Sequence, residues 1–178
     1  KVHVLLGYTS SPKAMAARDV SEPAGIPLMS TYATNPAVCK GYPLTFRTCF
    51  NDGFVVPVMA KFFAEDLGCK TAAVLTAIDD EYCIMASKLF VDAWTEIRGA
   101  DSIVAEVKCV QTDEDFTAQL AVIKQSGAEC VWSPVQNRPG GILLRQAWEI
   151  GVTPGVYFGS GADWDIQDLL DVAGPGGD

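Results

Sequence analysis

TAAVLTAIDDEYCIMASKLFVDAWTEIRG, residues 71–99, is the stretch that decides the fold. Residues 71–77 form an apolar run of strand length. After it, apolar residues recur at every fourth position, which is the spacing of one face of a helix. They are Met85, Leu89, Ala93 and Ile97, with Phe90 and Trp94 beside them. The stretch therefore predicts a strand followed by an amphipathic helix.

The same alternation extends along most of the chain. Further strands or extended segments are predicted at residues 2–8, 26–30, 44–50, 102–110, 129–135 and 155–161. Further helices are predicted at residues 11–25, 54–68 and 139–151. The helix at 54–68 would be capped by Asn51 or Asp52. One more helix is predicted after the segment TDED, and Phe116, Leu120 and Ile123 mark its apolar face. Continuous apolar strands separated by helices predict an α/β fold, with parallel sheets covered on both faces by helices.

Polar or glycine-rich segments follow most of the predicted strands: YTSS, STYAT, AIDDEY, SPVQNR and GSGADWD. In parallel sheets, ligands bind outside the carboxyl ends of the strands. Residues 29–38, MSTYATNPAV, concentrate hydroxyl and amide side chains before a proline. Local spacing leaves two interpretations open, a turn with a helix cap or the wall of a pocket.

Composition excludes several classes of protein. The chain has 178 residues, of which 49% are hydrophobic, so it can form a packed core. The 13 basic and 22 acidic side chains give a net charge of −9, which argues against a nucleic-acid-binding surface. No run approaches the roughly 20 apolar residues that span a bilayer.

The six cysteines show neither a CxxC pair nor a zinc-binding spacing. Cys39 and Cys49 would either pair in an oxidising compartment or remain thiols. Cys109 and Cys130 lie in strand-like runs and are expected to be small buried hydrophobic residues.

Catalytic interpretations find little support. His3 is the only histidine and is expected to be structural within the first strand, so a nucleophile has no base. Cys83 is expected to be a packed thiol. Asp79 and Asp80 suit either a magnesium pair or a helix cap, and the acids at 113–115 begin a helix. GSG at 159–161 lacks the rest of a dinucleotide fingerprint, and no GxxxxGK[ST] motif occurs. We expect no enzyme activity, no cofactor and no metal.

Seven stretches in the same order resemble one family across nearly the whole chain. They are GYTSS (7–11), AGIPLMSTYATNPAV (24–38), LTFRTCFNDGFVVPVMAKFFAEDLG (44–68), AAVLTAIDDEY (72–82), DEDFTAQLAVIK (113–124), ILLRQAWEIGV (142–152) and FGSGADW (158–164). The chain resembles the type I periplasmic solute-binding proteins, in particular the branched-chain amino acid-binding family of ABC transporters.

The resemblance implies two α/β lobes that close on a ligand, without catalysis. Residues 1–51 would belong to a partial first lobe, 52–160 would form the core of the second, and 161–178 would be the crossover and the start of the return segment. The chain would therefore correspond to an internal fragment, with one lobe complete and one partial.

The resemblance also implies the site residues. In the family, the loop that matches STYATNP presents N–H groups and a threonine hydroxyl to the ligand carboxylate. The residues implied are Ser11, Tyr32, Ala33 and Thr34 from the first lobe, and Tyr82, Gln136 and Asp163 from the second, with Asp163 pairing a ligand ammonium. Tyr32 replaces a smaller residue and Gln136 a frequent aromatic ring. With Trp164 nearby, these changes leave a flatter or aromatic ligand open.

The expected function is capture of a small amino acid or a related aromatic or aliphatic carboxylate in the periplasm or outside the cell. The partner would be the membrane permease of an ABC transporter. One alternative is the ligand-sensing domain of a receptor or regulator with the same fold. Another is a small magnesium-dependent enzyme that uses Asp79 and Asp80.

Overall fold

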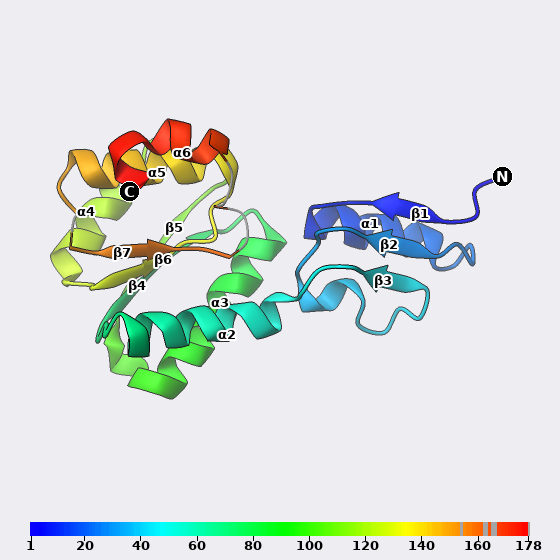
Figure 1. Ribbon diagram of the computed structural model, residues 1–178, viewed down its shortest axis with the longest axis horizontal. Coiled ribbons are helices and arrows are strands. Elements are labelled where there is room, and N and C mark those ends of the chain that lie inside the picture. The colour runs from blue at the N-terminus through cyan, green and yellow to red at the C-terminus, as the bar shows by residue number, and fades with distance from the viewer. Residues whose placement is uncertain (154, 162–163, 165–166, 178) are drawn as a thin grey trace. The chain divides into compact units, whose positions relative to one another are not determined.

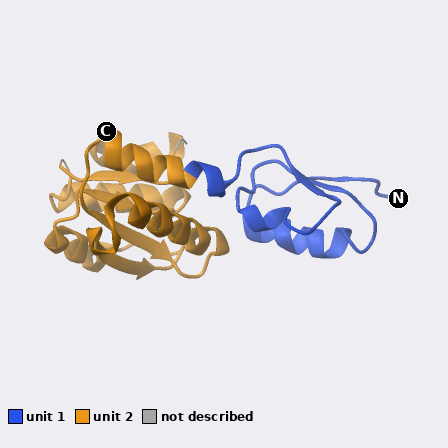
Figure 2. Cartoon of the chain, turned by 90° about the horizontal axis from the view of Figure 1, so that it is seen from below, with its two compact units in different colours: residues 1–55 blue, residues 56–178 orange. Residues whose placement is uncertain are grey.

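The computed structural model describes residues 1–178 except for positions 154, 162–163, 165–166 and 178. The chain forms two compact units, Lys1–Val55 (unit 1) and Val56–Asp178 (unit 2), which Figure 2 shows in blue and orange. Each unit contains its own parallel sheet and its own hydrophobic core.

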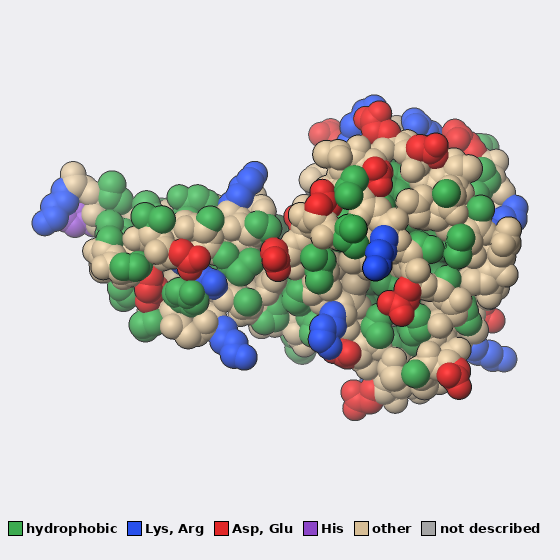
Figure 3. Space-filling view, turned by 180° about the vertical axis from the view of Figure 1, so that it is seen from behind, with side chains coloured by type: hydrophobic (Ala, Val, Ile, Leu, Met, Phe, Trp, Pro, Cys, Tyr) green, Lys and Arg blue, Asp and Glu red, His purple; other side chains and the backbone are tan. Residues whose placement is uncertain are grey.

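Unit 1 is built on three parallel strands in the order β1-β2-β3. Its elements are β1 (Leu5–Gly7), α1 (Ser11–Ser21), β2 (Leu28–Ser30), a 3-10 turn (Pro36–Val38) and β3 (Thr45–Arg47). Leu28 is fully buried, whereas Leu6 and Phe46, aligned across the sheet through Met29, are 72% and 47% exposed. Figure 3 shows hydrophobic side chains along the surface of this unit. In the described part of unit 1, α1 and the three-residue 3-10 turn accompany the sheet, and Leu6 and Phe46 stay exposed.

Arg18 fastens α1 to the 3-10 turn. Its guanidinium donates to the carbonyl oxygens of Ala37 and Val38, the latter at 2.8 Å, and lies 3.8 Å from the centre of the Tyr42 ring. Only 8% of Arg18 is exposed, so the aromatic face and the two carbonyls replace its lost hydration. This contact holds the loop after β2 in place from one side.

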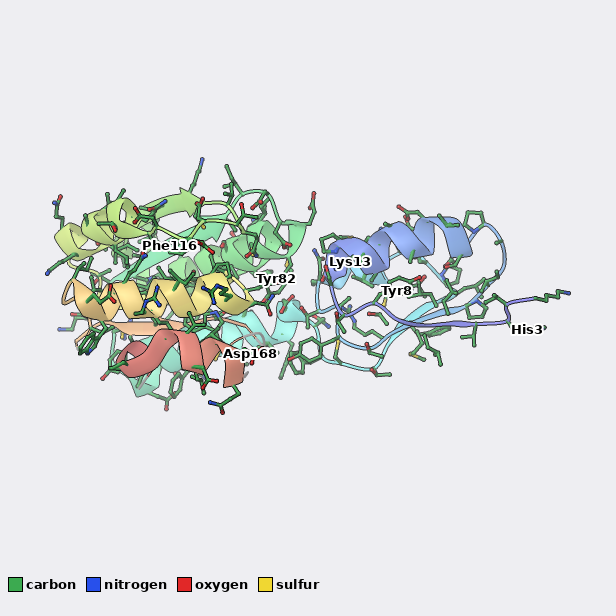
Figure 4. The ribbon with its side chains drawn as sticks, turned by 90° about the horizontal axis from the view of Figure 1, so that it is seen from above. His3, Tyr8, Lys13, Tyr82, Phe116 and Asp168 are labelled. Carbon is green, nitrogen blue, oxygen red and sulfur yellow. The ribbon has the colours of Figure 1, made fainter. Side chains whose placement is uncertain are left out.

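The first strand is shorter and more exposed than the sequence predicts. Only Leu5–Gly7 is a strand, and His3 lies on the exposed segment before it (Figure 4). The N–H of Leu5 donates to the carbonyl oxygen of Pro27 at 2.8 Å, but Pro27 has no N–H with which to extend the ladder. The prediction that His3 is part of a buried strand is therefore wrong.

Unit 2 is built on four parallel strands in the order β5-β4-β6-β7. The strands are β4 (Ala72–Ala77), β5 (Ile103–Cys109), β6 (Cys130–Trp132) and β7 (Tyr157–Gly159). The helices are α2 (Asp52–Lys61), which begins in unit 1, α3 (Glu81–Arg98), α4 (Thr117–Ser126), α5 (Asn137–Glu149) and α6 (Gln167–Ala173). A π-helical turn (Phe62–Asp66) extends α2, and 3-10 turns occur at Ala100–Ser102 and Gly174–Gly177. Figure 1 shows α5 and α6 on one side of the sheet and α2 and α3 on the other.

Aromatic rings fill the core between α2, α3 and the sheet. The Phe90 ring of α3 stacks on Trp132 of β6 with centroids 4.9 Å apart, and on Trp94 at 5.7 Å. Phe63 meets Phe90 edge-on at 6.2 Å. These rings are almost completely buried, and large buried aromatic side chains contribute strongly to the stability of a core.

The predicted fold class is confirmed, since every strand pair is parallel and helices flank the sheets.

The segment TDED precedes α4 as expected. The hydroxyl and then the N–H of Thr117 donate to the Asp115 carboxylate and lower the pKa of that exposed carboxyl group. No helix in the described part of the chain is long and apolar enough to cross a bilayer.

Asp80 caps helix α3. Its Oδ1 accepts the N–H groups of Tyr82 at 2.8 Å and Cys83 at 3.1 Å. Replacing Asp80 with alanine is therefore expected to lower the free energy of unfolding by about 1 kcal/mol, the usual worth of an N-cap. Urea unfolding followed by tryptophan fluorescence measures this, because all four tryptophans lie in unit 2.

Asp80→Asn is the matched variant, since its side-chain oxygen still accepts the two hydrogen bonds. It should retain most of the stability. A stabilisation by Mg²⁺ that both variants lose would contradict the capping role and favour the magnesium interpretation.

Candidate functional site

The loop of residues 30–36, hereafter the 30–36 loop, follows β2 in unit 1. Ser30 Oγ donates to the carbonyl oxygen of Tyr8 at 2.8 Å and accepts the N–H of Ala33 at 3.2 Å. Asn35 Oδ1 accepts the N–H of Ala37 at 2.8 Å and so caps the 3-10 turn. The loop therefore contains the helix cap that one interpretation of MSTYATNPAV predicts. The other interpretation, that the loop forms the wall of a pocket, remains a prediction.

Ser11 joins the loop after β1 to the 30–36 loop. It is the first residue of α1 and is buried, and its Oγ accepts the N–H of Asn35 at 3.2 Å. A hydroxyl that accepts one hydrogen bond retains its own hydrogen for donation. The structure thus places Ser11 beside the predicted anion-binding loop, at the N-terminus of an 11-residue helix.

The remaining predicted residues of unit 1 lie at different depths. Thr34 is 5% exposed, and neither its N–H nor its hydroxyl donates to another described residue of the chain. Ala33 is fully buried against Ala14 and Val38, so its side chain belongs to the core, and its N–H and carbonyl oxygen are hydrogen-bonded to Ser30 and Arg47. Tyr32 is half-buried. Ligand contact by these residues remains a prediction.

Arg47 was not among the predicted site residues. A single guanidinium nitrogen, Nη1, donates to three consecutive carbonyl oxygens of the loop, those of Ala33 at 3.2 Å, Thr34 at 3.0 Å and Asn35 at 2.9 Å. The only signal in the sequence was a charged residue within the otherwise apolar or hydroxyl-bearing segment LTFRTCF.

Among the residues that the structure describes, two residues other than glycine have left-handed backbone conformations, and both lie where a strand is followed by a loop or helix. Tyr8 follows β1 with φ of 62°, and Asn137 begins α5 with φ of 53°. Such conformations are disfavoured for residues other than glycine and concentrate at functional sites. They mark the same ends of the two sheets as the polar loops do.

A hydrogen-bonded network connects the strand ends of unit 2. The N–H of Gln111 donates to Asp79 Oδ1 at 2.9 Å, and Gln111 Nε2 donates to the sulfur of Cys83 at 2.9 Å. Gln111 Oε1 accepts the N–H of Gln136 at 3.3 Å. Gln111, which the sequence analysis missed, therefore connects β5 with the starts of α3 and α5. Gln136 directly precedes α5.

Tyr82, at the start of α3, is 3% exposed (Figure 4). The predicted ammonium partner, Asp163, lies outside the described residues. Its neighbour Trp164 donates from Nε1 to the carbonyl oxygen of Val135 at 2.8 Å, which fastens the segment after β7 to the end of β6. Contacts of Tyr82, Gln136 and Asp163 with a ligand remain predictions.

Cys83 is a packed thiol, as expected from the sequence. It is fully buried, and its sulfur lies 3.1 Å from the carbonyl oxygen of Pro134. Asp79 and Asp80 both accept backbone N–H groups, and the described residues contain no group of three or more His, Cys, Asp or Glu that would hold a metal ion.

The cysteines are thiols in this structure. Cys109 and Cys130 are buried, as predicted, and burial together with the nearby Asp113 and Asp79 carboxylates raises the pKa of Cys109 to about 12. Cys39 and Cys49 are half-buried and are not joined by a disulfide.

Parallel α/β units with polar loops at the carboxyl ends of their strands are typical of α/β proteins that bind ligands at these ends. The chain belongs to the periplasmic binding protein family, whose model matches residues 1–178. This finding confirms the resemblance found in the sequence.

Among named relatives, the leucine-, isoleucine-, valine-, threonine- and alanine-binding protein of Pseudomonas aeruginosa is 30% identical over 155 residues, 85% of this chain and 40% of that protein. Among solved structures, the leucine-binding protein LivK of Thermotoga maritima is 28% identical with a TM-score of 0.91, covering 98% of this chain and 49% of that one. A solute-binding protein of an ABC transporter from R. palustris, in complex with 4-hydroxybenzoate, is 25% identical with a TM-score of 0.84, covering 98% and 47%. The chain thus spans less than half the length of these proteins.

Proposed function

We propose that the chain belongs to a solute-binding protein that captures a small amino acid or a related carboxylate in the periplasm or outside the cell, without catalysis, and delivers it to the permease of an ABC transporter. In this proposal unit 1 binds the ligand carboxylate through Ser11 and Thr34. Unit 2 contributes Tyr82 and the residues at the start of α5.

The observation that carries the proposal is the 30–36 loop. Ser11, a buried residue at a helix N-terminus, accepts the N–H of Asn35, the residue after Thr34, and the N–H and hydroxyl of Thr34 donate to no other described residue. Oriented donors at a helix N-terminus bind an anion without a direct ion pair. Such an arrangement suits a carboxylate.

The relatives support two classes of ligand that share this carboxylate. The P. aeruginosa relative is named for aliphatic amino acids, and the R. palustris structure contains 4-hydroxybenzoate. An amino acid would in addition need an anionic partner for its ammonium, the role we propose for Asp163. Names that refer to binding and transport favour transport over sensing by a receptor or regulator.

Titration calorimetry with leucine and 4-hydroxybenzoate tests the proposal, with leucinamide and 4-hydroxybenzamide as matched probes without a carboxylate. We expect one of the acids to bind at least about 10-fold more tightly than its amide, because hydrogen bonds to a charged group contribute about 1.5–3 kcal/mol. Thr34→Val keeps the shape of the side chain and removes the hydroxyl. It should weaken binding of that acid by about 10- to 100-fold.

Thr71→Val is the control, since the Thr71 hydroxyl donates to the carbonyl oxygen of Gly127 within unit 2 at 3.0 Å. It should leave binding unchanged. An acid and its amide that bind equally well, or fail to bind at all, would contradict the proposal.

A further inference from the structure

We propose that Arg47 is a positioning residue of the carboxylate site, holding the carbonyl groups of the 30–36 loop so that its N–H groups face the ligand. This inference rests on the proposed function for its ligand. Its structural part stands on contacts within unit 1 alone.

The three Arg47 bonds orient consecutive peptide groups. In a trans peptide the C=O of one residue and the N–H of the next point in opposite directions. The carbonyl of Ala33 is held by Arg47 Nη1 at 3.2 Å, so the N–H of Thr34 is directed away from the guanidinium. The carbonyl of Thr34 is held twice, by Arg47 at 3.0 Å and by the N–H of Asp52 at 3.0 Å.

The position of Ser11 agrees with this orientation. The N–H of Asn35, paired in its peptide with the Thr34 carbonyl, donates to Ser11 Oγ at 3.2 Å. Ser11 therefore lies on the side of the loop opposite to Arg47. The next peptide has no N–H because Pro36 follows, so Arg47 can hold the Asn35 carbonyl without directing a further donor. The donors on the Ser11 side are then the Thr34 N–H and the Ser11 hydroxyl.

The charge of Arg47 acts in the same direction. Arginine remains protonated in proteins, and none of the ion pairs among the described residues includes Arg47. Its positive charge thus meets the negative ends of three peptide dipoles and aligns them, with their positive ends toward the Ser11 side. Donors that are fixed before the ligand arrives bind it more tightly than donors that must first be ordered.

A lysine is the informative substitution, because all three bonds use one nitrogen. Nη1 of arginine has two hydrogens, which the three carbonyl oxygens share, whereas the ammonium group of lysine has three hydrogens and a full charge on a side chain of similar length. Arg47→Lys should therefore keep part of the function, whereas Arg47→Met removes both charge and donors. Arg98→Met is the matched control: Arg98 also donates to a carbonyl, that of Ala64, but lies at the last residue of α3 in unit 2.

Two readouts test the proposal. In the ligand-free chain, amide hydrogen exchange measured by NMR should accelerate at Asn35 by at least about 10-fold in Arg47→Met and less in Arg47→Lys, since the held conformation protects this amide. The exchange rate of the Leu28 amide in β2, which donates to the Leu44 carbonyl at 2.9 Å, should be unchanged.

The second readout is ligand binding. In titrations with 4-hydroxybenzoate, leucine and their amides, the preference for the acid should fall by about 10-fold or more in Arg47→Met. It should recover partly in Arg47→Lys and be unaffected in Arg98→Met.

The outcomes separate the two proposals. If the unaltered chain prefers the acid and Arg47→Met keeps that preference, the positioning role is overturned while the proposed function stands. If the unaltered chain shows no preference, the proposed function fails, and the exchange at Asn35 alone decides whether Arg47 positions the loop. Equal acceleration at Leu28 would assign Arg47 a general structural role and also overturn the inference.

Discussion

Replacing Trp132 with alanine is expected to lower the free energy of unfolding of unit 2 by about 3–5 kcal/mol, the usual range for removing a buried aromatic side chain. Trp132 is fully buried and stacks on Phe90 with ring centroids 4.9 Å apart and an interplanar angle of 6°. Its removal would leave a cavity between α3 and the sheet and expose the face of Phe90. Urea unfolding followed by the fluorescence of the remaining three tryptophans measures the loss.

Trp132→Phe separates packing from hydrogen bonding. The Nε1 group of Trp132 is buried and has no hydrogen-bond partner in the described part of the chain. An unsatisfied buried donor is unfavourable by about 1–3 kcal/mol, so its removal should offset part of the lost volume. We expect phenylalanine to lower the free energy of unfolding by less than half as much as alanine. Equal losses in both variants would contradict the packing seen at this ring.

The periodic parts of the sequence predicted much of unit 2. The apolar run at 71–77 became β4, and the fourfold repeat from Met85 became α3, because burial in a doubly covered sheet leaves a strong pattern. The pattern placed Phe90 and Trp94 on one helix face. It could not place Trp132 against Phe90, since contacts between segments 42 residues apart depend on strand order. Periodicity carries no information on strand order.

Unit 1 followed the sequence less closely. The apolar residues around His3 predict a buried strand. In the structure this segment contains the edge strand β1, which is paired with β2 over only three residues, next to Pro27. Hydrophobic composition predicts which residues favour burial, whereas the covering of a face depends on which elements are present to cover it. The exposure of Leu6 and Phe46 is the consequence.

The sequence likewise predicted some residues of the candidate site and missed others. Ser11 and Thr34 were predicted as site residues because short polar side chains at a strand end are visible in the sequence and because the family resemblance points to them. Arg47 and Gln111 were missed because their hydrogen-bond partners are backbone groups far along the chain. The carbonyl groups that Arg47 holds lie 12 to 14 residues away, and the N–H of Gln136 lies 25 residues from Gln111. Nothing in the residue type reveals such a contact until the fold brings the strands together.

Replacing Gly141 with alanine is expected to destabilise unit 2, although the same change normally stabilises a helix by up to about 1 kcal/mol. A Cβ atom at Gly141 in α5 would lie 2.6 Å from the carbonyl oxygen of Leu169 and 2.9 Å from Cβ of Val172, both in α6. These distances are below van der Waals contact, and the nearer atom belongs to the backbone. Helix α6 would have to move, so we expect a net loss of about 1–3 kcal/mol, as in other overpacked sites.

Gly53→Ala, in the first turn of α2, is the control of opposite sign. Its Cβ would meet Oδ1 of Asn51 at 2.9 Å and Cγ of Pro36 at 3.4 Å, and the Asn51 side chain is able to rotate away. We expect this variant to be neutral or slightly stabilised in unfolding followed by far-UV circular dichroism. A Gly141→Ala variant that is as stable as Gly53→Ala would contradict the close packing of α5 on α6. A loss of stability in Gly141→Ala alone would instead show that the close contact between α5 and α6 needs a glycine here, although glycine disfavours a helix.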